Sequence, residues 1–287
     1  MLTTVTDILH DEGFLEGGQE PVFHIRLISG RELNVQVFAN NGIHFHTRVK
    51  HRGVMPTEYD KCSNGWRRFP QYAPEPLGQY FRHDWEIIIV RGIAHRPVLI
   101  GDIAKNKHDL VQKLIGFFAT STEVVSMKKP LESHRTFLRG VRDRAIDPAA
   151  AAVVNKWMST DELDHLPHIS QHGDFVVNNL GIGGSRLVVF DWEDFDRVAL
   201  PGFDLCTALA SDTRLTPERM RAVMHSTGGV SQPYETLLRT VCPLLGLTPD
   251  GFRRMIPLYL AIFLDLKRNY GEAVQAAVRK LIQCLHS

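Results

Sequence analysis

The sequence predicts an α+β protein in which strands come first and helices follow. Three runs with strand character lie within the first 50 residues, and residues 85–90 form an apolar, β-branched run suited to a buried strand. From Asp102 onward, apolar residues recur at helical spacing. The 287 residues are enough for two lobes with separate cores or for one large domain.

The first elements follow from local patterns. An amphipathic stretch predicts a helix over residues 5–14. A hairpin signal, Asn40-Asn41-Gly42, separates the second and third strand-like runs. A short helix is expected over residues 57–62, before Ser63-Asn64-Gly65. The three strands are expected at residues 22–28, 32–38 and 43–50.

The second part of the chain predicts helices at almost every apolar stretch. Asp102 is an acidic cap in front of the first of them, and prolines begin several of the others. The expected helices cover residues 102–118, 131–144, 149–158, 203–211, 217–225, 233–245, 249–263 and 270–285.

One segment between these helices carries chemistry. It contains H-G-D-F-V-V-N-N from His172, L-V-V-F-D-W-E-D ending at Asp194, and P-G-F-D-L ending at Leu205. A loop aspartate can take a proton from a substrate hydroxyl, while an amide oxygen and a second carboxylate can hold Mg²⁺ against nucleotide phosphates. Asp174, Asn179 and Asp191 supply these three groups in that order.

This ordered set resembles the aminoglycoside phosphotransferase and choline kinase family. The resemblance implies a two-lobed protein-kinase-like fold, with a small β-rich N-terminal lobe (1–92) that covers the nucleotide and a larger, mostly helical C-terminal lobe (93–287). It implies that Asp174 is the catalytic base and that Asn179 and Asp191 are the metal ligands. His172 would pack against the loop and brace it, and Asp204 would tie the loop down from the helix after Pro201.

The resemblance also assigns nucleotide contacts in the N-terminal lobe. Ser29 and Gly30, in the first hairpin, would cover the phosphates, although a run of glycines is missing there. Lys50 is the expected phosphate contact on the third strand and Arg48 is the alternative, because both lie on one face. Glu58 would be the ion-pair partner of the basic residue. Backbone groups from Arg91 to Ile93 would form the hinge that meets the adenine edge.

The implied reaction transfers the γ-phosphoryl group of ATP, with GTP as the alternative donor, to a hydroxyl of a small molecule, with Mg²⁺ as cofactor. Only twelve residues separate Asp191 from Asp204, too few for a segment that docks a polypeptide substrate. Glu193, Asp194 and Asp196 could bind a cationic or polyhydroxylated acceptor such as an aminoglycoside, a sugar or an amino alcohol; a solvated acidic loop fits them equally well. Further candidates to line the pocket are Asp265, Tyr259 and Tyr270, with core packing favoured for both tyrosines.

Composition restricts the partners. The 33 basic and 32 acidic residues give a net charge of +1, which does not indicate a nucleic-acid partner. The apolar stretches are too short to span a membrane, and the four scattered cysteines suggest a reducing compartment, so a cytoplasmic location is expected. Two alternatives stay open: a pseudokinase-like nucleotide-binding or regulatory module without transfer activity, and an enzyme acting on a glycan precursor or a lipid-linked sugar.

Overall fold

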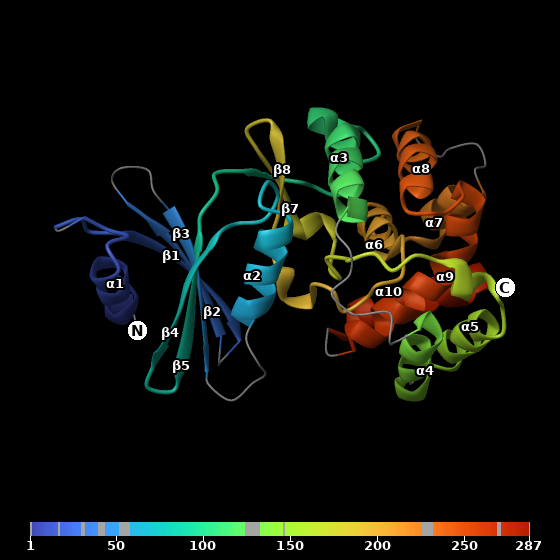
Figure 1. Cartoon of the computed structure of the whole chain (residues 1–287), viewed down its shortest axis with the longest axis horizontal. Coiled ribbons are helices and arrows are strands. Elements are labelled where there is room, and N and C mark those ends of the chain that lie inside the picture. Colours follow the sequence, from blue (N-terminus) through green and yellow to red (C-terminus); the bar gives the residue numbers. More distant parts are fainter. Residues whose placement is uncertain are drawn as a thin grey trace. The chain divides into compact units, whose positions relative to one another are not determined.

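The computed structural model describes the chain except for residues 1, 17, 30–31, 40–43, 52–57, 124–132, 146, 226–231, 269–270 and 287. The chain forms two compact units, residues 1–95 and 96–287, whereas the sequence places the lobe boundary between 92 and 93. The first unit is built around a β-sheet and the second is mostly helical (Figure 1). The predicted α+β fold, with strands first and helices later, is confirmed.

The first unit contains a five-stranded antiparallel sheet. Its strand order is β1-β2-β3-β5-β4, so β4 and β1 are the two edges. The edge strand β4 is absent from the sequence prediction, because Pro76 and Gly78 weaken its strand signal. His83, with a φ of 51°, lies in the turn that joins it to β5. The strands are β1 (Val22–Ser29), β2 (Glu32–Phe38), β3 (His44–His51), β4 (Pro76–Arg82) and β5 (Trp85–Arg91).

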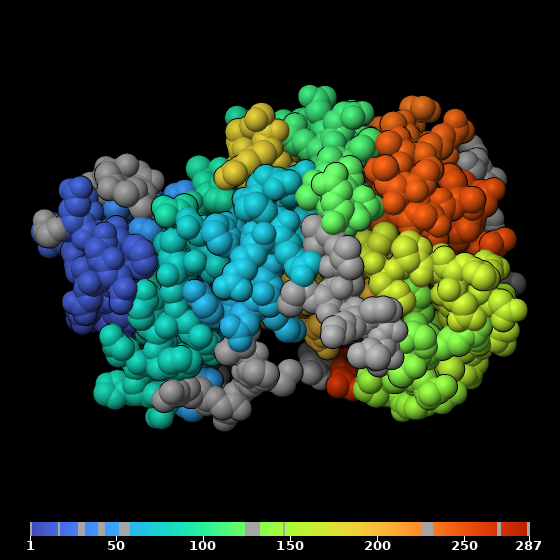
Figure 2. Space-filling model, viewed as in Figure 1, coloured from blue at the N-terminus to red at the C-terminus, as the bar shows by residue number. Residues whose placement is uncertain are grey.

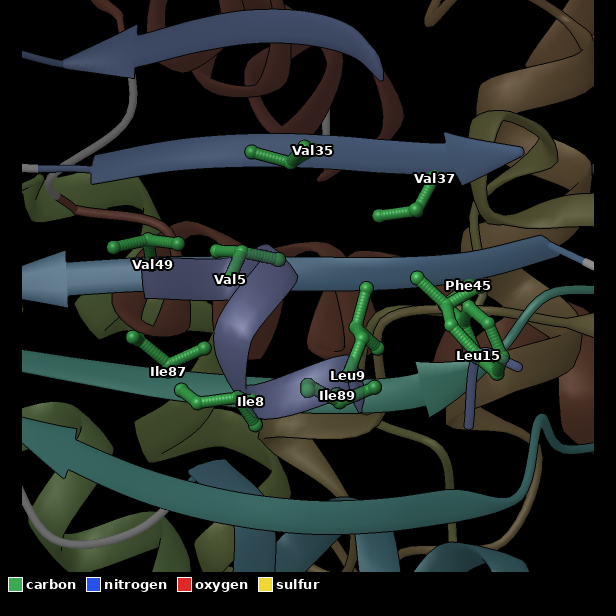
Figure 3. Packing of buried hydrophobic residues seen from close by; sticks show 10 residues of the cluster. All are labelled: Val5, Ile8, Leu9, Leu15, Val35, Val37, Phe45, Val49, Ile87 and Ile89. Carbon is green, nitrogen blue, oxygen red and sulfur yellow. The ribbon is translucent and has the colours of Figure 1, made fainter. Parts of the chain in front are cut away.

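One face of this sheet packs against helix α1 (Leu2–Asp11). Apolar side chains at alternate positions of β2, β3 and β5 point toward Val5, Ile8 and Leu9 of the helix (Figure 3). Because strand side chains alternate between faces, the residues between them on β3 lie on the opposite face. The core therefore directs Arg48 and Lys50 to the face away from α1.

Helix α1 ends earlier than residue 14, the predicted end. Gly13 has a φ of 70°, a conformation that favours glycine, and its N–H donates to the carbonyl of His10. The N–H of Phe14 then donates to the carbonyl of Leu9 at 2.8 Å, which closes the helix in the usual C-terminal manner. The apolar residues after the glycine thus belong to a turn.

Helix α2 (Glu58–Arg68) is longer than the predicted helix at 57–62. Ser63, Asn64 and Gly65 lie inside it, and Ser63 and Gly65 are buried where the helix packs against β4. Small side chains allow this close packing, which outweighs their low helix propensity. Thr57 and the predicted turn at Asn40-Asn41-Gly42 lie outside the described residues.

The second unit is a set of packed helices. Helix α9 contacts α4, α5, α6, α7, α8 and α10 and is central to the unit, and α3 packs on α8. The yellow-green atoms of α4 and α5 form one continuous surface in the space-filling view (Figure 2). The helices are α3 (Leu110–Glu123), α4 (His134–Arg144), α5 (Pro148–Met158), α6 (Phe203–Asp212), α7 (Pro217–His225), α8 (Gln232–Leu244), α9 (Pro249–Leu266) and α10 (Glu272–His286).

The helix predicted at 102–118 begins only at Leu110. Asp102 accepts the N–H of Leu99 at 2.9 Å and pairs with Lys107 at 2.8 Å, so it closes a turn instead of capping a helix. Asn106, at a φ of 46°, interrupts the helical pattern, and its amide oxygen accepts the N–H of Val111 in the first turn of α3.

A small antiparallel sheet in the second unit frames the segment that carries the chemistry. Its strands, in the order β6-β7-β8, are Arg96–Pro97, Leu180–Gly183 and Arg186–Val189. Leu180 pairs with Val189, so the residues just before β7 lie beside those just after β8. This hairpin brings the loop at 172–179 next to Asp191. Among the described residues, no helix has the length and apolar character needed to cross a membrane.

Candidate active site

The loop from His172 is held by the first turn of α6. The Asp204 carboxylate accepts the N–H groups of His172 at 2.5 Å and Gly173 at 2.9 Å, and its own N–H donates to Oε1 of Gln171 at 3.0 Å. Burial raises the pKa of Asp204 to about 7, while the two N–H donors favour the charged form. Asp204 therefore binds two consecutive backbone amides of the loop.

His172 links the loop to the strand that precedes Asp191. Its Nε2 donates to the carbonyl of Phe190 at 2.8 Å, and its Nδ1 accepts the N–H of Asp174 at 3.2 Å. The ring also meets the edge of Trp192, with centroids 4.7 Å apart. Burial lowers the pKa of His172 to about 4, so the neutral ring keeps both hydrogen bonds at neutral pH.

Gly173 is required by the close approach of two backbone segments. Its φ is 86°, and a Cβ atom there would lie 2.4 Å from the carbonyl oxygen of Asp194. A larger residue would push the loop away from the turn at Trp192–Asp194. The glycine thus allows Asp174 and Asp194 to come together.

These two carboxylates share a buried lysine. Lys267 Nζ lies 3.0 Å from Oδ2 of Asp174 and 2.7 Å from Oδ2 of Asp194, and its side chain is 4% exposed. Asp194 also pairs with Arg197. An ammonium group has three donors, so Lys267 can serve both carboxylates at once.

The pKa values of Asp174 and Asp194 are shifted in opposite directions, although both carboxylates contact Lys267. Burial raises the pKa of Asp174 above its usual range, with a further increase from the Asp194 charge, and Lys267 compensates only in part. Burial would also raise the pKa of Asp194, but Lys267 and Arg197 together outweigh it and lower that pKa. Asp194 is thus the more firmly ionised carboxylate, and Asp174 is the stronger proton acceptor once ionised.

Lys267 is missing from the sequence prediction, although a signal for it exists. It follows Tyr259 and Phe263 at four-residue intervals along α9 and its end, and both of these residues are buried. A lysine that continues a buried helical stripe must find carboxylate partners. The buried stripe of α9, rather than a sequence motif, therefore indicates where Lys267 lies.

The acidic residues after Asp191 divide between different partners. The sequence left two alternatives open for Glu193, Asp194 and Asp196, acceptor contacts or a solvated acidic loop. Asp194 is not solvated, because it is buried between Lys267 and Arg197. Oxygen atoms of Glu193 and Asp191 lie within 4.8 Å of each other. The N–H of Asp196 donates to the carbonyl of Gln171 at 2.9 Å, next to the loop.

Asn179 is oriented by the loop itself. Its side-chain NH₂ donates to the carbonyl of Asp174 at 2.9 Å and to the Asp174 carboxylate at 3.2 Å, which turns its amide oxygen the other way. Its backbone carbonyl accepts the N–H of Phe190 at 2.8 Å, which places Asp191 nearby. One amide oxygen with the carboxylates of Asp191 and Glu193 is a set of hard oxygen donors, which suits Mg²⁺.

The predicted basic residues of the first unit form a cluster with two acids. Arg48 pairs with both Glu32 and Glu58, and Lys50 pairs with the other oxygen of Glu58. The side chains of Arg48 and Lys50 are each 22% exposed. Glu58, at the start of α2, therefore holds both candidate phosphate ligands on the same face of β3.

The predicted hinge uses two of its amides within the first unit. The N–H of Arg91 donates to the carbonyl of Glu75 at 2.7 Å, and that of Gly92 donates to the carbonyl of His44 at 2.8 Å. The Arg91 side chain pairs with Glu75, and the carbonyl of Ile93 contacts Nδ1 of His95 at 2.8 Å. An adenine contact at the hinge would therefore have to use groups other than the N–H groups of Arg91 and Gly92.

The remaining predicted residues have varied positions. Ser29 ends β1 and pairs with Glu32 across the strands, while Gly30 and Tyr270 lie outside the described residues. Tyr259 is fully buried and donates to the carbonyl of Pro201 at 2.6 Å, which makes it a core residue. Asp265 pairs with Arg144 at 2.7 Å.

No protein-family model and no curated protein sequence matches the chain. Solved structures do match it over nearly its whole length. A thermostable mutant of aminoglycoside phosphotransferase APH(4)-Ia, in ternary complex with ADP and hygromycin B, is 12% identical, with a TM-score of 0.60 and coverage of 98% of this chain and 96% of that one. A macrolide 2'-phosphotransferase type I has 13% identity and a TM-score of 0.63, with coverage of 98% and 97%.

The macrolide 2'-phosphotransferase MphH from Brachybacterium faecium, solved as the apoenzyme, is similar to the same extent. Its identity is 16%, its TM-score is 0.59, and coverage is 98% of this chain and 97% of that one. At these identities the similarity concerns the fold. The chain has the two-lobed protein-kinase-like fold of small-molecule phosphotransferases, as its resemblance to that family implies.

Proposed function

We propose that the chain is an ATP-dependent phosphotransferase that transfers the γ-phosphoryl group to a hydroxyl of a small molecule. The observation that carries the proposal is the state of Asp174. It lies in a braced H-G-D-x-x-x-x-N loop, it is buried against Lys267, and its pKa is raised toward the range of a useful base.

The chain's own residues account for the proton transfer. As the acceptor oxygen bonds to the γ-phosphorus and the bond to the β–γ bridging oxygen breaks, Asp174 takes the hydroxyl proton and ADP leaves with the bridging oxygen. Asn179 fixes the Asp174 carboxylate by donating to it at 3.2 Å. Lys267 keeps the carboxylate in place without removing its basicity, because the same ammonium is shared with Asp194.

The remaining roles concern the nucleotide. Asn179 and Asp191 would hold Mg²⁺, with Glu193 as a further oxygen donor, and the bound ion would neutralise phosphate charge. Lys50 would contact the phosphates, with Arg48 as the alternative. We name ATP rather than GTP because similar solved structures contain ADP or AMP-PNP.

Nucleotide binding is the first test. Calorimetry with AMP-PNP should give an affinity that depends on Mg²⁺, and Asp191→Ala should weaken it about 10- to 100-fold, as for the loss of a hydrogen-bonded charged ligand. Asp161→Ala is the matched control, because that carboxylate is 96% exposed and pairs with Arg135. An affinity that is equal with and without metal would contradict the metal assignment.

Transfer is the second test. ATP consumption is measured with aminoglycosides, choline-like amines, nucleosides, and free, acidic and phosphorylated sugars. Asp174→Asn should keep AMP-PNP affinity and lower turnover on the order of 10²-fold or more, the range for general-base catalysis. Asp164→Asn, a surface pair with Arg135, is the control. Nucleotide binding without acceptor-stimulated ATP consumption would favour the pseudokinase-like alternative.

A further inference from the structure

A cavity in the second unit is linked to the catalytic loop through ion pairs. Its volume is about 300 Å³, and it is lined by Phe137, Arg144, Arg197, Asp265, Leu266 and Arg268. Leu266 and Arg268 are the neighbours of Lys267 in the sequence, and Arg197 pairs with Asp194, which shares Lys267 with Asp174. The cavity therefore adjoins the proposed base through two ion-pair partners.

The lining is rich in guanidinium groups. Three arginines face a single carboxylate, and that carboxylate, Asp265, is bound by Arg144 through contacts of 2.7 to 3.3 Å. Arg197 is directed to Asp194. Arg268 is exposed, and its guanidinium has no ion-pair partner among the described residues. A guanidinium has five donors in a fork, so Arg268 can donate two hydrogen bonds to an anionic ligand.

Two of the acidic residues expected to attract a cation lie with other groups. Asp194 is neutralised by Lys267 and Arg197, and Glu193 lies with Asp191. An acceptor with several ammonium groups would place them against three guanidiniums in this cavity, where like charges repel. An anionic group would instead receive the fork-shaped donors that arginine offers to carboxylates and phosphates.

We infer that the acceptor carries an anionic group, a carboxylate or a phosphate, which binds Arg268 with Arg197 and Arg144 while its hydroxyl reaches Asp174. The inference rests on the proposed function and specifies its substrate class. Phe137 provides an aromatic wall on which the apolar face of a sugar ring can pack. Polycationic aminoglycosides would then be poor substrates, in contrast to the acidic-loop expectation from the sequence.

The test uses four compounds that share one sugar ring: glucose, glucosamine, glucuronate and glucose 6-phosphate. With the full chain, ATP and Mg²⁺, an anionic member should exceed glucose in kcat/KM by about 10-fold, the scale of a charge-assisted pair, and glucosamine should rank last. The ranking of glucuronate against glucose 6-phosphate separates a carboxylate from a phosphate. The anion preference should weaken as ionic strength rises.

The variant Arg268→Gln tests whether the preference for anionic sugars comes from this arginine. It should raise KM for the anionic sugar about 10-fold, with little change for glucose and with unchanged AMP-PNP affinity. Arg254→Gln is the control, since Arg254 lies on α9, is 64% exposed and pairs with Glu162, and neither residue lines the cavity. Equal kcat/KM for all four sugars, preference for glucosamine, or an anion preference that survives Arg268→Gln would each overturn the inference.

If none of the four sugars is phosphorylated, a direct binding measurement tests the inference. Saturable binding of glucuronate or glucose 6-phosphate in the presence of AMP-PNP, lost in Arg268→Gln, supports the inference, and its absence overturns it. AMP-PNP affinity is measured separately, so failure of the phosphotransferase proposal shows as absent nucleotide binding. A chain that binds AMP-PNP but shows no preference for anions contradicts the acceptor class alone.

Discussion

The two units each contain an ion-pair cluster of two cations and two carboxylates, but the residue at the centre has the opposite charge. In the first unit, one central carboxylate, Glu58, joins two cations, Arg48 and Lys50. In the second unit, one cation, Lys267, joins two carboxylates, Asp174 and Asp194. The first cluster is partly open, with its cations 22% exposed, whereas the members of the second are 4 to 6% exposed.

The difference shows how each cluster can serve a phosphoryl transfer. In the first cluster Glu32 and Glu58 balance the two cations, and the partial exposure of Arg48 and Lys50 allows a ligand to reach them. In the second cluster Asp194 has Arg197 as a further cation whereas Asp174 shares Lys267 with it, and burial keeps these charges from being screened. The open cluster thus suits the phosphate contact that we propose for Lys50, and the buried cluster suits the proton acceptor that we propose for Asp174.

Removal of the buried cation should give the largest effect on stability. Lys267→Met leaves two buried carboxylates without their shared partner, so we expect the free energy of unfolding of the second unit to fall by about 3–5 kcal/mol. Denaturant unfolding followed by tryptophan fluorescence measures it. Lys113→Met, which changes a lysine whose ammonium donates to the carbonyl of His108 and has no carboxylate partner among the described residues, should change stability little.

A second variant separates unpaired charge from lost packing. Asp194 keeps Arg197 as a partner in Lys267→Met, and adding Asp194→Asn removes its like charge from the side of Asp174, so part of the lost stability should return. An equal loss in the single and double variants would mean that Lys267 acts through its methylene packing rather than through its charge.

The exposed cluster should show a smaller effect, seen in activity rather than stability. We expect Lys50→Ala to reduce kcat/KM for ATP about 10- to 100-fold, as for loss of a charge-assisted hydrogen bond, and Arg48→Ala to reduce it less, because Arg48 is held by Glu32 as well as Glu58. The reverse ranking would assign the phosphate contact to Arg48. The control is Arg26→Ala. Arg26 lies on β1 of the same sheet, and among the described residues no ion pair joins it to Glu32 or Glu58.

Local patterns predicted more of the fold than of the site. Helix α7 has the predicted bounds, and β2 lies at residues 32–38 as expected, because their apolar spacing and end signals agree. Edge strand β4 has a weak intrinsic signal and depends on pairing with β5. The motif predicted Asp174, Asn179 and Asp191 together because they occupy one short stretch of sequence.

The parts of the site that were not predicted depend on distant contacts. Lys267 meets Asp174 from 93 positions further along the chain, and nothing near either residue specifies that pair. The acidic cluster from Glu193 to Asp196 suggested a cation site because its partners, Arg197 apart, lie elsewhere in the sequence. Whether a carboxylate is exposed or neutralised is decided by tertiary packing.

The smallest expected effect is a displacement of the pH profile. Asp174 must be ionised to accept a proton, and its pKa is raised by burial and by the charge of Asp194, so the acid limb of kcat/KM should lie above the usual range of an aspartate. Asp194→Asn removes that charge and should move the limb to lower pH. Asp204, with a pKa of about 7, is the other group able to produce a limb, and Asp194 is not among the influences on its pKa. A limb that stays near pH 7 in Asp194→Asn would therefore identify Asp204, whereas a limb that moves down identifies Asp174 as the base.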